Sequence, residues 1–187
     1  MMTYAGLVNE YTKALNEVLL QIDGREIEPI VMKLNETMRN GNHIYVFGNG
    51  GCSAHAAHFC ADLGKMMKLE KNENYRITSL NDNMPSITAW ANDTGYENIF
   101  WRQLELYMTT GDVAFAMSGS GKSANVIKAI QYAKDRGNHT IGLSGFGGGQ
   151  LAQLADTGYV VPSHNMQIVE DAFGVILHTI FVALRDS

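Results

Sequence analysis

Histidines and a carboxylate recur at helical spacing in the stretch GNGGCSAHAAHFCADLGK, residues 48–65. His55, His58 and Asp62 are three and four residues apart, and on a helix His58 and Asp62 share a face and can point at one ion. Imidazole and carboxylate groups bind zinc and also act as general acids and bases. The glycines that open the stretch favour a bound anion. The stretch therefore predicts an anion pocket beside a metal or acid–base site.

Two glycine-rich loops, 48–53 and 118–123, each follow a predicted strand and precede a predicted helix. Glycines let backbone N–H groups approach an anion, and a helix N-terminus adds favourable partial charge. The other interpretation is that the glycines only permit sharp turns and the serines cap helices. Three serines and a lysine in SGSGKS favour phosphate at the second loop. The candidate substrate-binding residues of the two loops are Asn49, Gly50, Gly51, Cys52, Ser53, Ser118, Gly119, Ser120 and Ser123.

The second loop ends like a Walker A motif, G-x-x-x-x-G-K-[ST], but lacks its first glycine. That position is Ala116, inside a predicted strand, and no later strand ends in an evident magnesium-binding aspartate. The first loop, GNGGCS, also fails the dinucleotide pattern G-x-G-x-x-G. A nucleotide-binding protein is therefore not predicted.

Strands that alternate with helices are expected to position these loops. Residues 4–21 and 25–40 have apolar positions three and four apart, which predicts two N-terminal helices. The predicted strands are HIYVF (43–47), YRITS (75–79), VAFAM (113–117), TIGLS (140–144) and GYVVP (158–162). The helical patterns between and after them, including 124–136 and 166–185, predict a mainly parallel sheet covered on both faces. Ligands of such sheets bind beyond the carboxyl ends of the strands, where both glycine loops lie.

Length and composition restrict the class of protein. The 187 residues predict a single domain over 1–187, with helices in 1–40 and an α/β core in 43–187. A net charge of −5 argues against a nucleic-acid surface. The N-terminus lacks a signal-peptide pattern, and the apolar run GVILHTIFVAL is too short for a membrane span. Cys52 and Cys60 lie eight apart on one predicted helix, too far for a disulfide, so we expect a reduced, cytoplasmic protein.

The chain resembles the sugar isomerase (SIS) domain family and, within it, the sedoheptulose-7-phosphate isomerases, also called phosphoheptose isomerases. Five motifs in the family's order carry the resemblance over nearly the whole chain: GNGG leading into AHFCADL, TAWANDTGYENIFWRQ, SGSGKSANV, TIGLSGFGGGQLAQLAD and EDAFGVILH. The resemblance implies a three-layer α/β/α sandwich with a five-stranded parallel sheet. It also implies a cytoplasmic homotetramer with active sites at subunit interfaces, one zinc ion per subunit, and aldose–ketose isomerisation of a phosphorylated seven-carbon sugar.

The family's functional positions fall on particular residues of this chain. Its phosphate site matches Ser118, Ser120 and Ser123, and its residues near the sugar match Asn92 and Asp93. The metal ligands that the resemblance implies are His58, Asp62, Glu170 and His178. The family's glutamate base falls on Asp62, and its proposed general acid falls on His178.

Several of these positions depart from the family pattern. Asp62 replaces a glutamate, and Glu170 replaces a glutamine. Cys52 replaces the first-loop serine, and His55 stands where an acidic residue is usual, which makes it a candidate for an additional ligand. We expect Glu170 to compensate for the shorter Asp62, with either carboxylate as base in an enediol mechanism and His178 as acid.

Three functions remain open from the sequence. The first is isomerisation of sedoheptulose 7-phosphate to D-glycero-D-manno-heptose 7-phosphate. The second is isomerisation of another phosphorylated sugar, which the lysine at position 122 of the phosphate loop indicates. The third is a non-catalytic SIS protein that binds a protein partner, as the related DnaA initiator-associating protein does. Taken alone, His178 on an apolar helix is typical of a core histidine, but the four ionisable positions together favour an enzyme.

Overall fold

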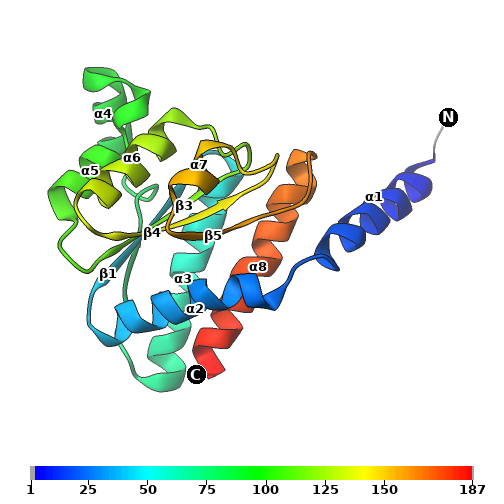
Figure 1. The fold of residues 1–187 in the computed structure, drawn as a ribbon, viewed down its shortest axis with the longest axis horizontal. Helices are drawn as coiled ribbons and strands as arrows, with labels where there is room; N and C mark the ends of the chain where they lie inside the picture. Colours follow the sequence, from blue (N-terminus) through cyan, green and yellow to red (C-terminus); the bar gives the residue numbers. More distant parts are fainter. Residues whose placement is uncertain (1–2, 187) are drawn as a thin grey trace.

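The computed structural model describes residues 3–186, built around a five-stranded parallel sheet in the order β2-β1-β3-β4-β5 (Figure 1). The strands are β1 (His43–Gly48), β2 (Arg76–Ser79), β3 (Val113–Ser118), β4 (His139–Ser144) and β5 (Thr157–Val160). Each strand begins and ends within two residues of its predicted range. The predicted parallel sheet is therefore confirmed.

The strand order reverses between β1 and β3. After β1 the chain adds β2 on one side and then crosses over to place β3 on the other. The register pairs Gly48 with Met117, which aligns the carboxyl ends of these two strands. In open α/β sheets a crevice at such a reversal is the usual ligand position. The two glycine loops, which follow β1 and β3, therefore lie next to each other.

Helices cover both faces of the sheet. One face packs against α2 (Gly24–Arg39), α3 (Gly51–Lys71) and α8 (Met166–Asp186), and the other against α5 (Trp101–Tyr107), α6 (Ala124–Asp135) and α7 (Gly149–Leu154). Alternate side chains of β3 enter the two layers, with Phe115 in the first and Ala114 and Ala116 in the second. The three-layer α/β/α sandwich is confirmed. Helix α4 (Met84–Thr94) and a 3-10 helix, η1 (Tyr96–Asn98), connect β2 to α5.

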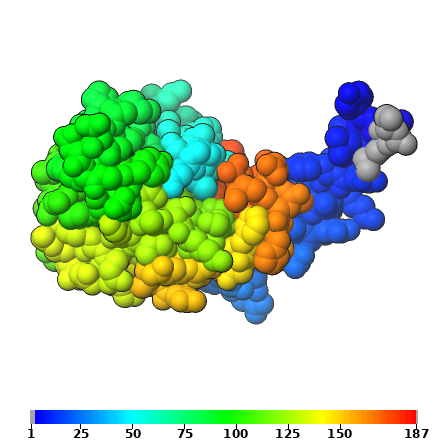
Figure 2. Space-filling view, turned by 90° about the horizontal axis from the view of Figure 1, so that it is seen from above, coloured from blue at the N-terminus to red at the C-terminus, as the bar shows by residue number. Residues whose placement is uncertain are grey.

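Helix α1 (Tyr4–Leu19) projects from the body of the molecule near α8 (Figures 1 and 2). Tyr11 ties it to α8, because its hydroxyl donates to Asp171 Oδ2 at 2.6 Å. Toward its N-terminal end Tyr4 is 91% exposed, and Leu7 and Val8 are also exposed. The projection therefore holds apolar side chains that the described chain leaves in solvent.

Helix α8 matches the predicted helix 166–185 and extends eight residues before the apolar run at 174–184. By length and composition it passes the test for a helix that could cross a membrane. However, 44% of the most apolar stretch of α8 is buried inside the protein. Phe173 and Ile180 belong to the core cluster that α8 shares with α2 and α3. This packing is that of a core helix, and core helices often pass the same test.

Candidate active site

A pocket of about 240 Å³ lies where the loops after β1 and β3 meet the start of α8. Its lining residues are Asn49, Gly50, Gly51, Cys52, Ser118, Gly119, Ser120, Ser123, Met166 and Glu170. All of these except Met166 were predicted from the sequence as site residues. The pocket occupies the switch point of the sheet, as expected for a ligand site.

The second loop presents unused hydrogen-bond donors to this pocket. Ser123 is the N-cap residue of α6, but its side chain makes no capping hydrogen bond. Its Oγ instead lies 3.1 Å from Ser118 Oγ. The interpretation of Ser123 as only a helix cap is therefore not supported. The amides of Ala124 and Asn125, at the positive end of α6, receive no capping bond from Ser123, so they can bind an anion together with the hydroxyls.

The first loop brings a second helix N-terminus to the pocket. Helix α3 also begins without a side-chain cap. Gly50, its N-cap residue, has a φ of 54°, in the left-handed region that favours glycine. The absence of a side chain at Gly51 leaves room for the carboxylate of Glu170, which lies where a Cβ would be in close contact. The loop therefore places the start of α3 directly against a carboxylate from α8.

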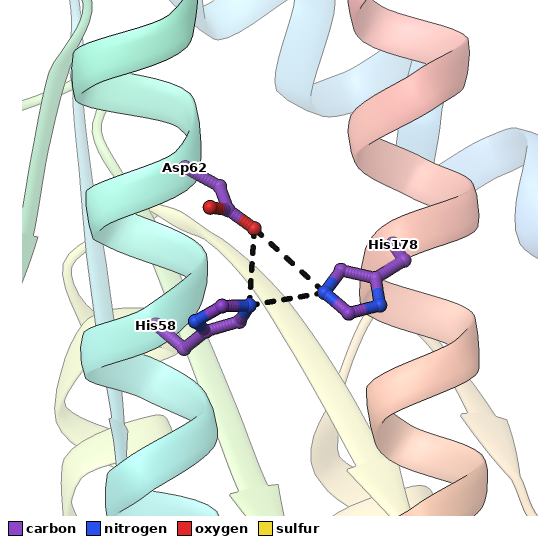
Figure 3. Close-up of side chains that lie close together, drawn as sticks. All are labelled: His58, Asp62 and His178. Carbon is purple, nitrogen blue, oxygen red and sulfur yellow. Dashed lines mark hydrogen bonds and ion pairs between the residues drawn. The ribbon is translucent and has the colours of Figure 1, made fainter.

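Three of the predicted metal ligands meet between α3 and α8 (Figure 3). His58 Nε2 lies 3.0 Å from His178 Nε2 and 3.2 Å from Asp62 Oδ2. The distance from His178 Nε2 to Asp62 Oδ2 is 3.8 Å. Both histidine side chains are more than half exposed, and Asp62 is 28% exposed. The three ligand atoms therefore converge on one point that remains open to other ligands.

These distances fit a divalent ion. A tetrahedral zinc ion with bonds of about 2.0–2.1 Å separates its ligand atoms by about 3.3 Å. The observed separations of 3.0, 3.2 and 3.8 Å lie around that value, as three corners of one tetrahedron would. Two imidazole nitrogens and a carboxylate oxygen are also a donor set that zinc accepts. The residues present can therefore hold the ion.

Glu170 lies apart from this trio. It precedes His178 by eight residues on α8, which is about 12 Å along the helix. Its carboxylate lies against Gly51 and lines the loop pocket. Within one chain, three of the four expected metal ligands thus meet, while Glu170 faces the loop pocket. Its part in metal binding stays a prediction.

His55 lies between the trio and Glu170, and Cys52 lines the loop pocket. A Cβ placed on Gly174 of α8 would be 3.4 Å from His55 Cε1, so the imidazole packs on α8 between Glu170 and His178. Burial lowers the pKa of His55, an effect that the charge of Glu170 partly opposes. His55 is not part of the ligand cluster found among residues 3–186. Burial raises the pKa of Cys52 to about 11, so this thiol is not activated as a nucleophile.

Three predicted substrate-binding residues do not line the pocket. Asn92 and Asp93 are exposed at the end of α4, where Asn92 Nδ2 donates to Asp93 Oδ1 at 2.8 Å. Ser53 lies in the first turn of α3, where its N–H donates to the carbonyl of Gly50. Any contact of these residues with a sugar stays a prediction.

Three residues near the site were not predicted from the sequence. Met166 lines the pocket. Asn125 and Tyr96 hydrogen-bond to Asn49. Asn125 follows the phosphate loop by only two residues, and that proximity was a usable signal. No pattern in the sequence indicates that Met166 or Tyr96 reaches the loops.

Comparison with known proteins agrees with this geometry. Residues 10–145 match the SIS domain. The chain is 40% identical to the probable phosphoheptose isomerase of Thermoplasma acidophilum over 169 residues, which covers 90% of this chain and 92% of the relative. It is 41% identical to the phosphoheptose isomerase of Aliarcobacter butzleri over 145 residues, 78% of this chain and 76% of the relative.

A solved structure has a closely similar fold. Phosphoheptose isomerase GmhA from Neisseria gonorrhoeae has a TM-score of 0.92 at 25% identity, covering 99% of this chain and 100% of that chain. The parallel sandwich, the pocket at its switch point and the matching domain together place the chain in the SIS domain family. Its similarity to phosphoheptose isomerases defines it more closely as a sugar-phosphate isomerase.

Proposed function

We propose that the chain interconverts sedoheptulose 7-phosphate and D-glycero-D-manno-heptose 7-phosphate through an enediol. The observation that carries this proposal is the placement of an anion pocket and an acid–base trio along the same two helices, α3 and α8. The serines of the second loop would bind the phosphate, and the carbonyl end of the sugar would reach the trio. The relatives named phosphoheptose isomerases support the same substrate.

The spacing of the two groups supports a seven-carbon substrate. His58 follows Gly51 by seven residues on α3, and His178 follows Glu170 by eight on α8. These intervals are about 10–12 Å along each helix. An extended seven-carbon chain with its phosphoester is about 10 Å long, given C–C bonds near 1.5 Å. A five-carbon sugar phosphate is shorter by two C–C bonds, about 2.5 Å when extended, and would span the interval less well.

The side chains of the site can move the proton that the reaction requires. A base must remove a proton from C1 of the ketose and return a proton to C2. An acid or a cation must stabilise the carbonyl oxygen as it gains charge. Asp62 and Glu170 are the two candidate bases, and His178 is the candidate acid. Asp62 Oδ2 lies 3.8 Å from His178 Nε2, so a base and an acid stand side by side. Glu170, nearer the phosphate end, would also contact the sugar hydroxyls.

Zinc, one ion per subunit, is part of this proposal. His58, Asp62 and His178 would hold it, and the fourth position would take Glu170 or an oxygen of water or substrate. When bound, it would supply a Lewis acid that polarises the carbonyl oxygen; His178 would then act as a ligand in place of a proton donor, and Glu170 would be the carboxylate left free as base.

A cytoplasmic assembly of four copies, with active sites at subunit interfaces, completes the proposal. An apolar groove of about 450 Å³ lies between the turn after α1 and helix α8. Leu19, Ile27 and Val175 are among its lining residues. Together with the projecting α1, this surface is of the kind that homo-oligomers bury. Val175 and Thr179 of the groove lie within one helical turn of His178 on α8, so a subunit packed there would come near the trio.

The test is a comparison of substrates. Zinc-loaded protein is incubated with sedoheptulose 7-phosphate or ribulose 5-phosphate, and aldose formation is followed by NMR. We expect kcat/KM to favour the seven-carbon ketose, and Asp62→Asn and His178→Asn each to lower kcat by at least about 100-fold. Faster turnover of the five-carbon ketose would contradict the substrate assignment. No turnover of either ketose would overturn the proposed reaction.

A further inference from the structure

A reciprocal pair of amide side chains joins the two glycine loops. Asn49 Nδ2 donates to Asn125 Oδ1 at 2.9 Å, and Asn125 Nδ2 donates to Asn49 Oδ1 at 2.8 Å. Asn125 is only 2% exposed and lies in the first turn of α6, directly after the phosphate loop. Two hydrogen bonds therefore connect the loop after β1 to the loop after β3.

The backbone fixes the orientation of both amides. The N–H of Val126 donates to Asn125 Oδ1 at 2.9 Å, and only an oxygen can accept it. Asn125 must then present its NH₂ group to Asn49, and Asn49 Oδ1 must accept the hydrogen bond. A rotated Asn49 amide would set one NH₂ group against another and lose both bonds.

Tyr96 completes the constraint on Asn49. Its hydroxyl donates to Asn49 Oδ1 at 3.0 Å, so this oxygen already accepts two hydrogen bonds. An amide oxygen has two lone pairs, and both are therefore used. One hydrogen of Asn49 Nδ2 is donated to Asn125, and the other has no partner within residues 3–186. Asn49 lines the pocket, so it can meet a ligand only as a hydrogen-bond donor.

Tyr96 also holds the segment that carries Asn92 and Asp93. It lies in η1, immediately after α4. On the other side of the segment, Lys128 Nζ of α6 lies 3.5 Å from Glu97 Oε1 and donates to Asn98 Oδ1 at 3.2 Å. The hydroxyl of Tyr96 is thus the link between this segment and the first loop.

We infer that Asn125 and Tyr96 are positioning residues that hold Asn49 as a hydrogen-bond donor to an oxygen of the sugar. The inference rests on the proposed function, because it requires a sugar phosphate in the pocket. Neither residue needs to contact the substrate. Their effect belongs to the sugar end of the ligand, since the phosphate is bound by the second loop.

The test uses two variants with matched controls. Tyr96→Phe removes one hydroxyl from a side chain that is 56% exposed, and Tyr107→Phe does the same to one that is 55% exposed and lines a different pocket. Asn125→Ala is paired with Asn138→Ala, because Asn138 is also buried and accepts a backbone N–H, from Gly111. For each protein, calorimetry gives the Kd of sedoheptulose 7-phosphate and of inorganic phosphate. Turnover gives kcat and KM, and urea unfolding gives stability.

We expect Tyr96→Phe to weaken binding of the sugar phosphate by about 3- to 10-fold, the effect of one net hydrogen bond. Asn125→Ala should weaken it further, and both variants should leave the Kd of inorganic phosphate unchanged. The controls should change neither Kd, although Asn138→Ala should also lower stability, because it removes the acceptor of the Gly111 N–H.

Three other outcomes distinguish a failure of the inference from a failure of the proposed function. An unchanged Kd and KM in both Tyr96→Phe and Asn125→Ala, in a protein that isomerises the sugar, would overturn the inference alone. Equal losses for sugar phosphate and inorganic phosphate would also overturn it, because they indicate general damage to the loops. The expected binding pattern without any turnover by the unmodified protein would overturn the proposed reaction and support the inference.

Discussion

The Nε2 atoms of His58 and His178 lie 3.0 Å apart, which is favourable only if one carries a hydrogen toward the other or both face a cation. Asp62 Oδ2, 3.2 Å from His58 Nε2, is placed to share either arrangement. At the scale of single residues, the site is therefore a set of three side chains with one common target. Its identity as a metal site can be tested without any substrate.

His58→Asn and Asp62→Asn should each lower zinc affinity by at least about tenfold, because loss of a ligand costs no less than loss of its supporting hydrogen bond. His164→Asn is the control, since His164 is an exposed histidine outside the cluster. Zinc is measured by mass spectrometry after dialysis against a weak chelator. Equal zinc in all four proteins, the unmodified one included, would exclude the trio as the metal site.

Ser123→Ala should change stability little and substrate binding strongly. Its hydroxyl caps no helix, and water in the loop pocket can replace its hydrogen bond to Ser118 Oγ, so we expect the free energy of unfolding to change by less than about 0.5 kcal/mol. Asn83→Ala is the comparison, because Asn83 Oδ1 caps α4 by accepting from Ser86 N at 3.1 Å, and its loss should cost about 1 kcal/mol. KM for the sugar phosphate should rise in Ser123→Ala only. A stability loss in Ser123→Ala equal to that of Asn83→Ala would assign the serine to capping instead.

At the scale of elements, α3 and α8 both begin at the loop pocket and run past the trio. Each helix thus contributes to the loop pocket and to the trio. Gly174 lies between these ends in the interior of α8. It leaves space for His55 and lowers the stability of the helix.

Two glycine substitutions should therefore have opposite effects on stability. Gly174→Ala should stabilise the protein by about 0.5 kcal/mol, because a Cβ there meets His55 Cε1 at an ordinary 3.4 Å and alanine favours helix. Gly121→Ala should destabilise it by about 2 kcal/mol or more, since Gly121 has a φ of 65° and its Cβ would collide with the carbonyl of Gly148. Urea unfolding measures both. A destabilising Gly174→Ala would show that His55 cannot accommodate the methyl group.

At the scale of the whole molecule, stability should depend on pH through half-buried histidines. Burial lowers the pKa of His43 and of His139, each at the start of a strand. Below their ordinary value of 6.5, the unfolded chain binds protons that the folded chain does not. The free energy of unfolding should therefore fall as the pH drops below 6.5.

Urea unfolding measures this decline between about pH 7.5 and about pH 5, a range that brackets the ordinary pKa of histidine. His139→Gln should reduce it, because glutamine does not titrate and can keep the hydrogen bond to Thr157 Oγ1. An identical pH dependence in His139→Gln would show that other groups cause the decline.

The sequence predicted the strands well because each is a short apolar run that ends in a loop signal, as VAFAM does before SGSG. It also predicted nearly all of the pocket, since both glycine loops follow strands of one parallel sheet. It did not show that Glu170 lies against Gly51 within one chain, because helical spacing places Glu170 and His178 on one helix without showing which neighbour each meets. Tyr96 was missed because its partner, Asn49, is 47 residues away and only the folded chain brings them together.

Proton transfer by a carboxylate at the trio or the pocket is the central claim, and solvent exchange tests it most directly. Sedoheptulose 7-phosphate is incubated with the zinc-loaded protein in D₂O, and NMR detects deuterium at C2 of the aldose product. We predict deuterium at that carbon, formed at least about 100-fold more slowly by the Asp62→Asn, Glu170→Gln double variant. A double variant that forms aldose as fast as the unmodified protein would contradict the account.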